Sequence, residues 1–367
     1  MTDKSKAKKY NNIKLVIGIS KGITSWLLIL LFVLSGLSVK LFNEVALFTA
    51  NSYLQFLIFT VLSGIALSLI FAPVNFYTEY LLEHKFGLSN QTILKWIWEN
   101  LKSLLVGGVI GIPILILFFY VLNNFGDLWW LPFSIMLFLI SVVLAKILPI
   151  IILPLFYKVL PLEDEDLKER IIKLSENVKL NVENVFKFDM SKNTKKANAA
   201  FTGLGKTKKI ILGDTLLENF SNDEIETVIA HEIGHFKHKH ITKNIVISTL
   251  FSFLTFYLMA VLYKISLPLF GFENITDIAA LPILSLWVVV IGALQSPITN
   301  GISRKFEYEA DQYAIETTDK VEIFINALHK LNEQNLGDED PHPLVEWYSY
   351  SHPSIKKRIA FIEALKK

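Results

Sequence analysis

The stretch SNDEIETVIAHEIGHFKHKH, residues 221–240, carries the pattern around which the rest of the chain is organised. It contains H-E-x-x-H at His231, Glu232 and His235. On a helix the two histidines lie four residues apart on one face, so their imidazoles can share one tetrahedral zinc ion. Glu232, next to the first histidine, can reach a water on that metal and act as a general base. The pattern therefore indicates a zinc hydrolase.

The start of this helix is well marked in the sequence. Ser221 and Glu224 form an S-x-x-E capping box, and Phe220 can pack onto Ile225 across the first turn. Coincidence is the alternative, because a chain with eight histidines contains H-E-x-x-H by chance on the order of once in a hundred. A helix start at the right place makes coincidence rarer still.

The composition points to a membrane protein. Of the 367 residues, 52% are hydrophobic and only 19% are charged, with a mean hydropathy of +0.43. This is too apolar for an ordinary soluble domain. The net charge of +2 leaves no basic surface for nucleic acid. The absence of cysteine excludes disulfides, thiolate zinc ligands and thiol catalysis, so histidines and carboxylates must hold any zinc.

Apolar runs long enough to cross a bilayer occur six times, four before the H-E-x-x-H stretch and two after it. They lie near 22–42, 52–74, 103–123, 129–153, 243–264 and 278–300. We expect residues 22–160 to hold the first four spans and residues 243–302 to hold the last two. Residues 1–21 carry six lysines and one acid, which predicts a basic cytoplasmic tail.

The lysines and arginines orient these spans. They are abundant in 1–21, 75–102, 158–242 and 303–367, and absent from 43–51, 124–128 and 265–277. The positive-inside rule places the first group in the cytoplasm, with both termini inside. We therefore expect a multi-pass protein of the cell membrane, or of the endoplasmic reticulum membrane if the source is eukaryotic, with its catalytic side cytoplasmic.

Residues 161–242 are expected to form a cytoplasmic α+β catalytic segment. EDEDLKERIIKLSENVKL is typical of an amphipathic helix, and VENVFKFDM and KANAAFTGLGKTKKIILGD predict strands, with a hairpin near Gly205–Thr207. Residues 303–367 would form a second catalytic segment on the same side. The fold class is mainly α: about six transmembrane helices plus a cytoplasmic α+β zinc-peptidase domain with a small hairpin or edge strand.

A catalytic zinc held by two histidines needs a third protein ligand. The best candidate is Glu307, directly after the sixth apolar run. On a helix Asp311 shares its face and can accept a hydrogen bond from the outer nitrogen of a ligating histidine. Glu309 points elsewhere and is the weaker candidate. The alternative is a solvated, charged helix that emerges from the membrane.

The segments HEIGHFKHKHITKN, SRKFEYEAD, NAAFTGLGKTKKIILGDTLL and SHPSIKKR together resemble the type I CAAX prenyl protease family. These are integral-membrane zinc metalloendopeptidases of the gluzincin type, related to heat-shock membrane proteases. The resemblance runs in order from about Phe71 to the C-terminus. It implies one zinc ion per chain and the following site residues: His231, His235 and Glu307 as ligands, Glu232 as catalytic base, and Asp311 as the support of a ligand.

The resemblance also implies how a substrate is held. Asn198 and Ala199 would belong to an edge strand that pairs with an extended peptide. His352 and Arg358 would hold the substrate or stabilise the oxyanion. His240 fits the family pattern, but a direct metal role is not expected for it. The chain departs from the eukaryotic members in having six expected spans instead of seven.

The expected activity is peptide hydrolysis by a zinc-activated water, of the CAAX-processing type, on a peptide or protein with or without a prenylated C-terminus. One alternative has the same chemistry: a quality-control protease that cuts membrane proteins without a prenyl group. Another is a non-enzymatic transporter or scaffold, which would need polar or charged residues inside the spans. The bilayer is an expected partner, and nucleic acid is not.

Overall fold

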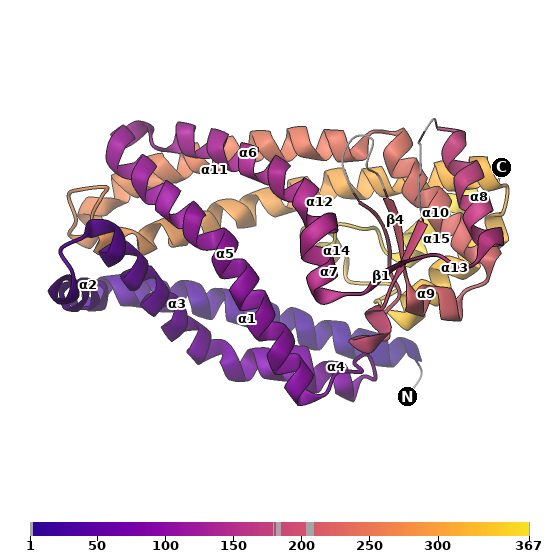
Figure 1. Cartoon of the computed structure of the whole chain (residues 1–367), viewed down its shortest axis with the longest axis horizontal. Helices are drawn as coiled ribbons and strands as arrows, with labels where there is room; N and C mark the ends of the chain where they lie inside the picture. The colour runs from indigo at the N-terminus through magenta and orange to yellow at the C-terminus, as the bar shows by residue number, and fades with distance from the viewer. Residues whose placement is uncertain (1–2, 179, 181–184, 203–208, 367) are drawn as a thin grey trace.

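A computed structural model describes residues 3–178, 180, 185–202 and 209–366. Long helices run along the longest axis, and a mixed part with a β-sheet lies at one end (Figure 1). Both chain termini lie at that same end. The prediction that the catalytic segments and the termini share one side is consistent with this arrangement.

Among the described residues, six helical segments are long and apolar enough to cross a membrane. They are Lys4–Leu34, Ser52–Lys85, Ile93–Leu128, Trp130–Phe156, His240–Phe270 and Ile278–Thr318. Their main helices are α1 (Asp3–Leu34), α3 (Ser52–Phe76), α5 (Ile93–Phe125), α6 (Trp130–Ile147), α11 (His240–Ser266) and α12 (Pro282–Thr318). The prediction of six spans is confirmed.

The N-terminal part differs from the prediction. Residues 1–21 were expected to form a tail and the first span was expected near 22–42, but α1 already begins at Asp3 and ends at Leu34. The lysine-rich half of α1 is held by contacts with residues far away in the sequence. One example is Asn11, whose Nδ2 donates to the Leu336 carbonyl at 2.7 Å. Such contacts leave no local signal, which is why sequence patterns placed the helix too late.

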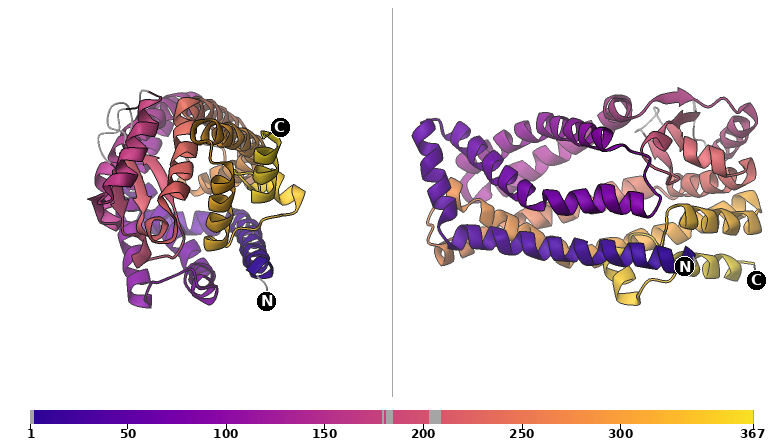
Figure 2. Two further views of the ribbon diagram at one scale, coloured as in Figure 1. Left: turned by 90° about the vertical axis from the view of Figure 1, so that its right-hand side faces the viewer. Right: turned by 90° about the horizontal axis from the view of Figure 1, so that it is seen from below.

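A short helix, α2 (Leu37–Phe48), begins within the last part of that predicted run and continues beyond it. Gly36 has φ 74°, a left-handed conformation that separates α2 from α1. With 12 residues, α2 is about 18 Å long and cannot cross a hydrocarbon core of about 30 Å. Instead it connects α1 to α3 at the end of the molecule away from the sheet (Figure 2).

Short helical pieces continue or link the spans. They are η1 (Tyr77–Leu81), α4 (Leu82–Lys85), η2 (Gly126–Leu128), η3 (Leu148–Ile152), α7 (Leu153–Phe156), η5 (Leu267–Phe270) and η6 (Ile278–Ala280). η1 and η3 are π-helical turns, and they let the chain leave α3 and α6 without a break in the helix.

The sheet has the order β1-β2-β4-β3. Its strands are β1 (Val159–Pro161), β2 (Val185–Phe188), β3 (Ala199–Thr202) and β4 (Lys209–Gly213). β2 and β4 are parallel, while β1 and β3 pair antiparallel at the two edges. The last three strands were predicted, and β1 was not. The predicted hairpin near Gly205–Thr207 lies outside the described residues.

The remaining helices lie at the same end of the molecule as the sheet (Figure 1). They are α8 (Glu165–Glu176), η4 (Met190–Lys192), α9 (Asp214–Asn219), α10 (Asn222–Lys237), α13 (Val321–Gln334), α14 (Pro343–Ser349) and α15 (Ile355–Ala364). One apolar core joins α8, the sheet, α10, α13 and α15. Ile225 and Ile229 of α10 are buried in it, as the predicted apolar stripe requires. This packing fixes the direction in which the opposite face of α10 points.

Candidate metal centre

The helix that carries H-E-x-x-H begins with the predicted capping box. The backbone N–H of Glu224 donates to Ser221 Oγ at 3.3 Å, and the backbone N–H of Ser221 donates to Glu224 Oε2 at 2.9 Å. Both interactions satisfy amide groups that a helix start leaves free, so α10 has a defined first turn.

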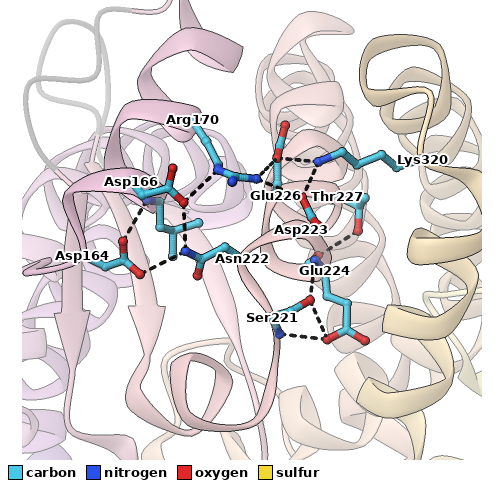
Figure 3. A network of polar contacts seen from close by, with 11 residues as sticks. Asp164, Asp166, Arg170, Ser221, Asn222, Asp223, Glu224, Glu226, Thr227 and Lys320 are labelled. Carbon is cyan, nitrogen blue, oxygen red and sulfur yellow. Dashed lines mark hydrogen bonds and ion pairs between the residues drawn. The ribbon is translucent and has the colours of Figure 1, made fainter.

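Ion pairs tie the first turns of α10 to its neighbours (Figure 3). Arg170 of α8 places Nη1 2.9 Å from Asp223 Oδ1 and 3.3 Å from Glu226 Oε2. Lys320, just before α13, places Nζ 2.6 Å and 2.9 Å from the same two atoms. The hydrogen bond from Lys320 holds the pKa of Asp223 below its usual range. Because these groups are partly exposed, the pairs add little to stability, and their main effect is to orient α10.

A glycine lets α10 approach α12 closely. A Cβ atom on Gly234, inside H-E-x-x-H, would lie 3.0 Å from Ala310 Cα and 3.1 Å from Tyr313 Cβ. Only hydrogen fits in this space. The backbone of α10 therefore lies directly against α12, and the two histidines of α10 face the acidic residues of α12.

This packing brings His231, His235 and Glu307 together. The two Nε2 atoms are 3.2 Å apart; that of His231 lies 3.4 Å from Glu307 Oε2, and that of His235 lies 3.3 Å from Glu307 Oε1. One ligand atom from each of the three side chains lies within 4.8 Å of the other two. The three side chains are thus close enough to hold a single cation between them.

The chemistry of the three side chains also fits a cation. His231 and Glu307 are 7% and 3% exposed, so their polar atoms are removed from water. Glu307 Oε2 is buried and receives no hydrogen bond of good geometry from the described residues, although His352 Nδ1 lies 2.8 Å away. A buried oxygen of this kind is costly unless a partner is bound. Two imidazoles and one carboxylate are a common set of zinc ligands.

His231 is oriented by a carboxylate on α12. Its Nδ1 lies 2.8 Å from Asp311 Oδ1, which leaves Nε2 directed at the metal position. Asp311 is itself held by Arg358 of α15, whose Nε donates to Oδ2 at 2.8 Å and whose Nη2 donates to Oδ1. Burial lowers the pKa of His231, but the neighbouring carboxylates of Asp311 and Glu307 raise it, to about 9 overall. A cation that binds Nε2 must therefore displace a proton.

His235 is oriented by a longer chain of contacts that sequence reasoning missed. Its Nδ1 lies 2.9 Å from Nδ1 of His240, the first residue of α11, and His240 Nε2 lies 2.9 Å from Glu309 Oε2. If Nε2 of His235 faces a metal, its Nδ1–H donates to His240, and the Nε2–H of His240 donates to Glu309. The ring of Phe306 stacks on His240 at 4.2 Å and fixes its plane. The available signal was the resemblance of His240 to the family pattern.

The other predicted site residues fall into two groups. Glu232 is half-buried on α10, and His352 has a side chain that is 64% exposed and lies beside Glu307. Both can therefore reach a substrate. Arg358 is 8% exposed and binds Asp311 through Nε and Nη2, while its Nη1 lies 3.8 Å from Glu307 Oε2. Its burial favours support of Asp311 over contact with a substrate.

Asn198 and Ala199 lie at the start of the edge strand. β3 begins at Ala199 and pairs with β4 on one side. The side-chain amide of Asn335 accepts from the backbone N–H of Ala197 at 2.9 Å and donates to its carbonyl at 3.2 Å. This interaction fixes the chain just before β3, so the predicted substrate strand has an anchored beginning.

Residues 161–366 match the family model of peptidase family M48. Residues 2–158 match the model of the CAAX prenyl protease N-terminal region, which has five membrane helices. The chain belongs to peptidase family M48. The family resemblance is thereby confirmed, and so is the prediction of a membrane metalloprotease. The transporter or scaffold alternative loses its support. In the matched N-terminal region the structure has α1, α2, α3, α5 and α6, of which α2 is too short to span.

Curated members of the M48 family are similar over most of their length. CAAX prenyl protease 1 of Saccharomyces cerevisiae is 35% identical over 316 residues, which are 81% of this chain and 69% of the yeast protein. The uncharacterized metalloprotease YhfN of Bacillus subtilis is 30% identical over 368 residues, which are 97% of this chain and 84% of YhfN. The crystal structure of S. mikatae Ste24p superimposes with a TM-score of 0.88 at 29% identity and covers 98% of this chain and 89% of its own.

Proposed function

We propose that this membrane metalloprotease hydrolyses peptide bonds with one zinc ion held by His231, His235 and Glu307. The proposal is carried by the proximity of the three side chains, because one ligand atom from each lies within 4.8 Å of the other two. When bound, zinc would lower the pKa of a water and polarise the carbonyl of the bond to be cut.

The residues around this position have distinct tasks. Glu232 takes a proton from the attacking water and returns it to the leaving amine. His352, exposed beside Glu307, donates a hydrogen bond to the carbonyl oxygen as negative charge develops on it. Asp311 keeps Nε2 of His231 free for the metal, and Arg358 holds Asp311 in place.

The peptide substrate adopts an extended conformation beside β3. An edge strand has a row of unpaired backbone groups that a substrate backbone can bind. That row begins at Ala199, directly after Asn198, whose carbonyl accepts from the Gly213 backbone N–H at 2.9 Å. We propose processing of the CAAX type, because the yeast relative that is 35% identical is named for that activity. A catalytic side that faces the cytoplasm would give access to such substrates.

The test of the catalytic base is Glu232→Gln, with Glu218→Gln on the exposed surface of α9 as the matched control. Glu232→Gln should retain zinc and its thermal unfolding temperature while peptide cleavage falls by at least about 100-fold. The control should cleave like the unmodified protein. Undiminished cleavage by purified Glu232→Gln would refute the assignment.

The substrate class needs a separate comparison. The purified protein should be offered a farnesylated C-terminal peptide, the same peptide without the lipid, and an unmodified membrane protein. CAAX-type processing predicts a clear preference for the first substrate. Efficient cleavage of the membrane protein alone would favour quality control by the same zinc chemistry.

A further inference from the structure

An apolar groove with a basic end runs between α11 and α12. It measures about 880 Å³ and is distinct from the metal position. Its walls include Val246 of α11, Ile298, Gly301 and Phe306 of α12, and Trp347 of α14. Lys239, Lys243 and Lys305 line its basic end.

The groove lies on the side of α12 that faces away from the metal centre. At about 100° per residue, Lys305 and Ile298 lie roughly 200° and 180° around the helix from Glu307. Ile298 is 54% exposed, and Leu294, one turn closer to the N-terminus of α12, is 71% exposed. On α11, Val246 is 54% exposed. Large, exposed apolar side chains on helices long enough to span a membrane contact lipid chains.

The charge of the groove is one-sided. All three charged lining residues are lysines that lie near the polar ends of the two spans, and no acidic residue is among the described lining. Glu309 is the nearby carboxylate, at 3.7 Å from Lys243 Nζ and 3.9 Å from Lys305 Nζ, and it already accepts from His240. One carboxylate cannot neutralise three ammonium groups. The basic end therefore favours an anion at the level where lipid headgroups lie.

We propose that this groove binds one anionic phospholipid of the surrounding bilayer. The phosphate lies among Lys239, Lys243 and Lys305, and an acyl chain follows the apolar walls formed by α11 and α12. Trp347, 55% exposed at the rim, has the amphipathic ring that is typical of the membrane interface. A zwitterionic lipid would fit the walls equally well but would leave the excess positive charge unpaired.

The test is lipid binding to the delipidated full-length protein in detergent, followed by native mass spectrometry. Phosphatidylglycerol should bind with one-to-one stoichiometry and more tightly than phosphatidylcholine. The double variant Lys239→Gln with Lys305→Gln should bind phosphatidylglycerol about 25-fold more weakly, about fivefold for each lysine, with phosphatidylcholine unchanged. Lys146→Gln, on the exposed surface of α6, is the matched charge control and should not change binding.

A second pair of variants tests the groove itself. A Cβ on Gly301 meets only Arg304 Nη2 at 3.7 Å, so Gly301→Leu should fold and fill the groove, excluding the acyl chain. Gly292→Leu, on the same helix with nothing within 4 Å of its Cβ, is the matched control and should bind lipid normally. Equal binding of the two lipids, or wild-type phosphatidylglycerol binding by both the lysine variant and Gly301→Leu, would overturn the proposal.

Discussion

Replacing Gly234 with alanine tests whether the close packing of α10 on α12 builds the metal centre. The new Cβ would lie 3.0 Å from Ala310 Cα and 3.1 Å from Ala310 O, where ordinary contacts are 3.4–4 Å. Both neighbouring atoms belong to the backbone of α12, so they cannot rotate away. The two helices must therefore separate by about 0.4 Å, twice the deviation of about 0.2 Å that a metal–ligand distance tolerates.

Two opposing effects decide the outcome for stability. Overpacking costs about 1–3 kcal/mol, while alanine is favoured over glycine in a helix by about 1 kcal/mol. The free energy of unfolding should thus fall by about 0–2 kcal/mol. The higher helix propensity of alanine does not restore the distance between Glu307 and the histidines. If the overpacking cost of about 1–3 kcal/mol falls on metal binding, zinc affinity should drop by about five- to 150-fold.

The assay is zinc competition with a chromogenic chelator on the detergent-solubilised protein, together with thermal unfolding without metal. Gly292→Ala on α12 is the control, because its Cβ has nothing within 4 Å and should leave zinc affinity unchanged. A Gly234→Ala protein with zinc affinity within twofold of the unmodified protein would refute the idea that this contact sets the ligand spacing.

The remaining predictions concern residues that support the site. His240→Ala should lower zinc affinity about 10- to 100-fold in the same competition assay, because His235 loses the partner of its Nδ1; unchanged affinity would contradict that role. Glu224→Gln should destabilise the protein by about 1 kcal/mol at pH 7. Burial raises the pKa of Glu224, but hydrogen bonds from Lys330 and from the Ser221 backbone outweigh burial and hold the pKa below its ordinary value of 4.5. This stabilisation is present above pH 4.5 and is lost as the pH falls through the folded-state pKa, so thermal unfolding of the two proteins should converge in acid. Asn335→Ala should raise KM for a peptide more than it lowers kcat, because the start of β3 loses its anchor; a change in kcat alone would argue against peptide binding there.

The parts of the site that could be predicted are those with a local sequence signal. A capping box and four-residue spacing define the face of α10, and the spacing of Glu307 and Asp311 follows the same helical period. Hydropathy found the spans because about 20 apolar residues are needed to cross a bilayer. The start of α1 was missed, since packing of its lysine-rich half against distant residues cannot be inferred from periodicity.

The partner of His235 could not be predicted for a geometric reason. In a continuous helix His240, five residues after His235, would lie about 140° around the axis and face away. The chain instead turns at Lys239, which has φ 56°, a left-handed value that is uncommon outside glycine. This turn begins a new helix and places His240 2.9 Å from His235. Sequence spacing alone carries no sign of such a turn.

A single helix, α12, therefore controls both histidines from two of its faces. Glu307 and Asp311, four residues apart, lie toward α10, where one approaches both imidazoles and the other binds Nδ1 of His231. Glu309, two residues from each, lies about 200° around the helix and meets His240 at the start of α11 instead. An E-x-E-x-D run can thus place one carboxylate at the metal position and one behind each histidine. Because α11 and α12 are also membrane spans, the orientation of both imidazoles depends on how the spans pack.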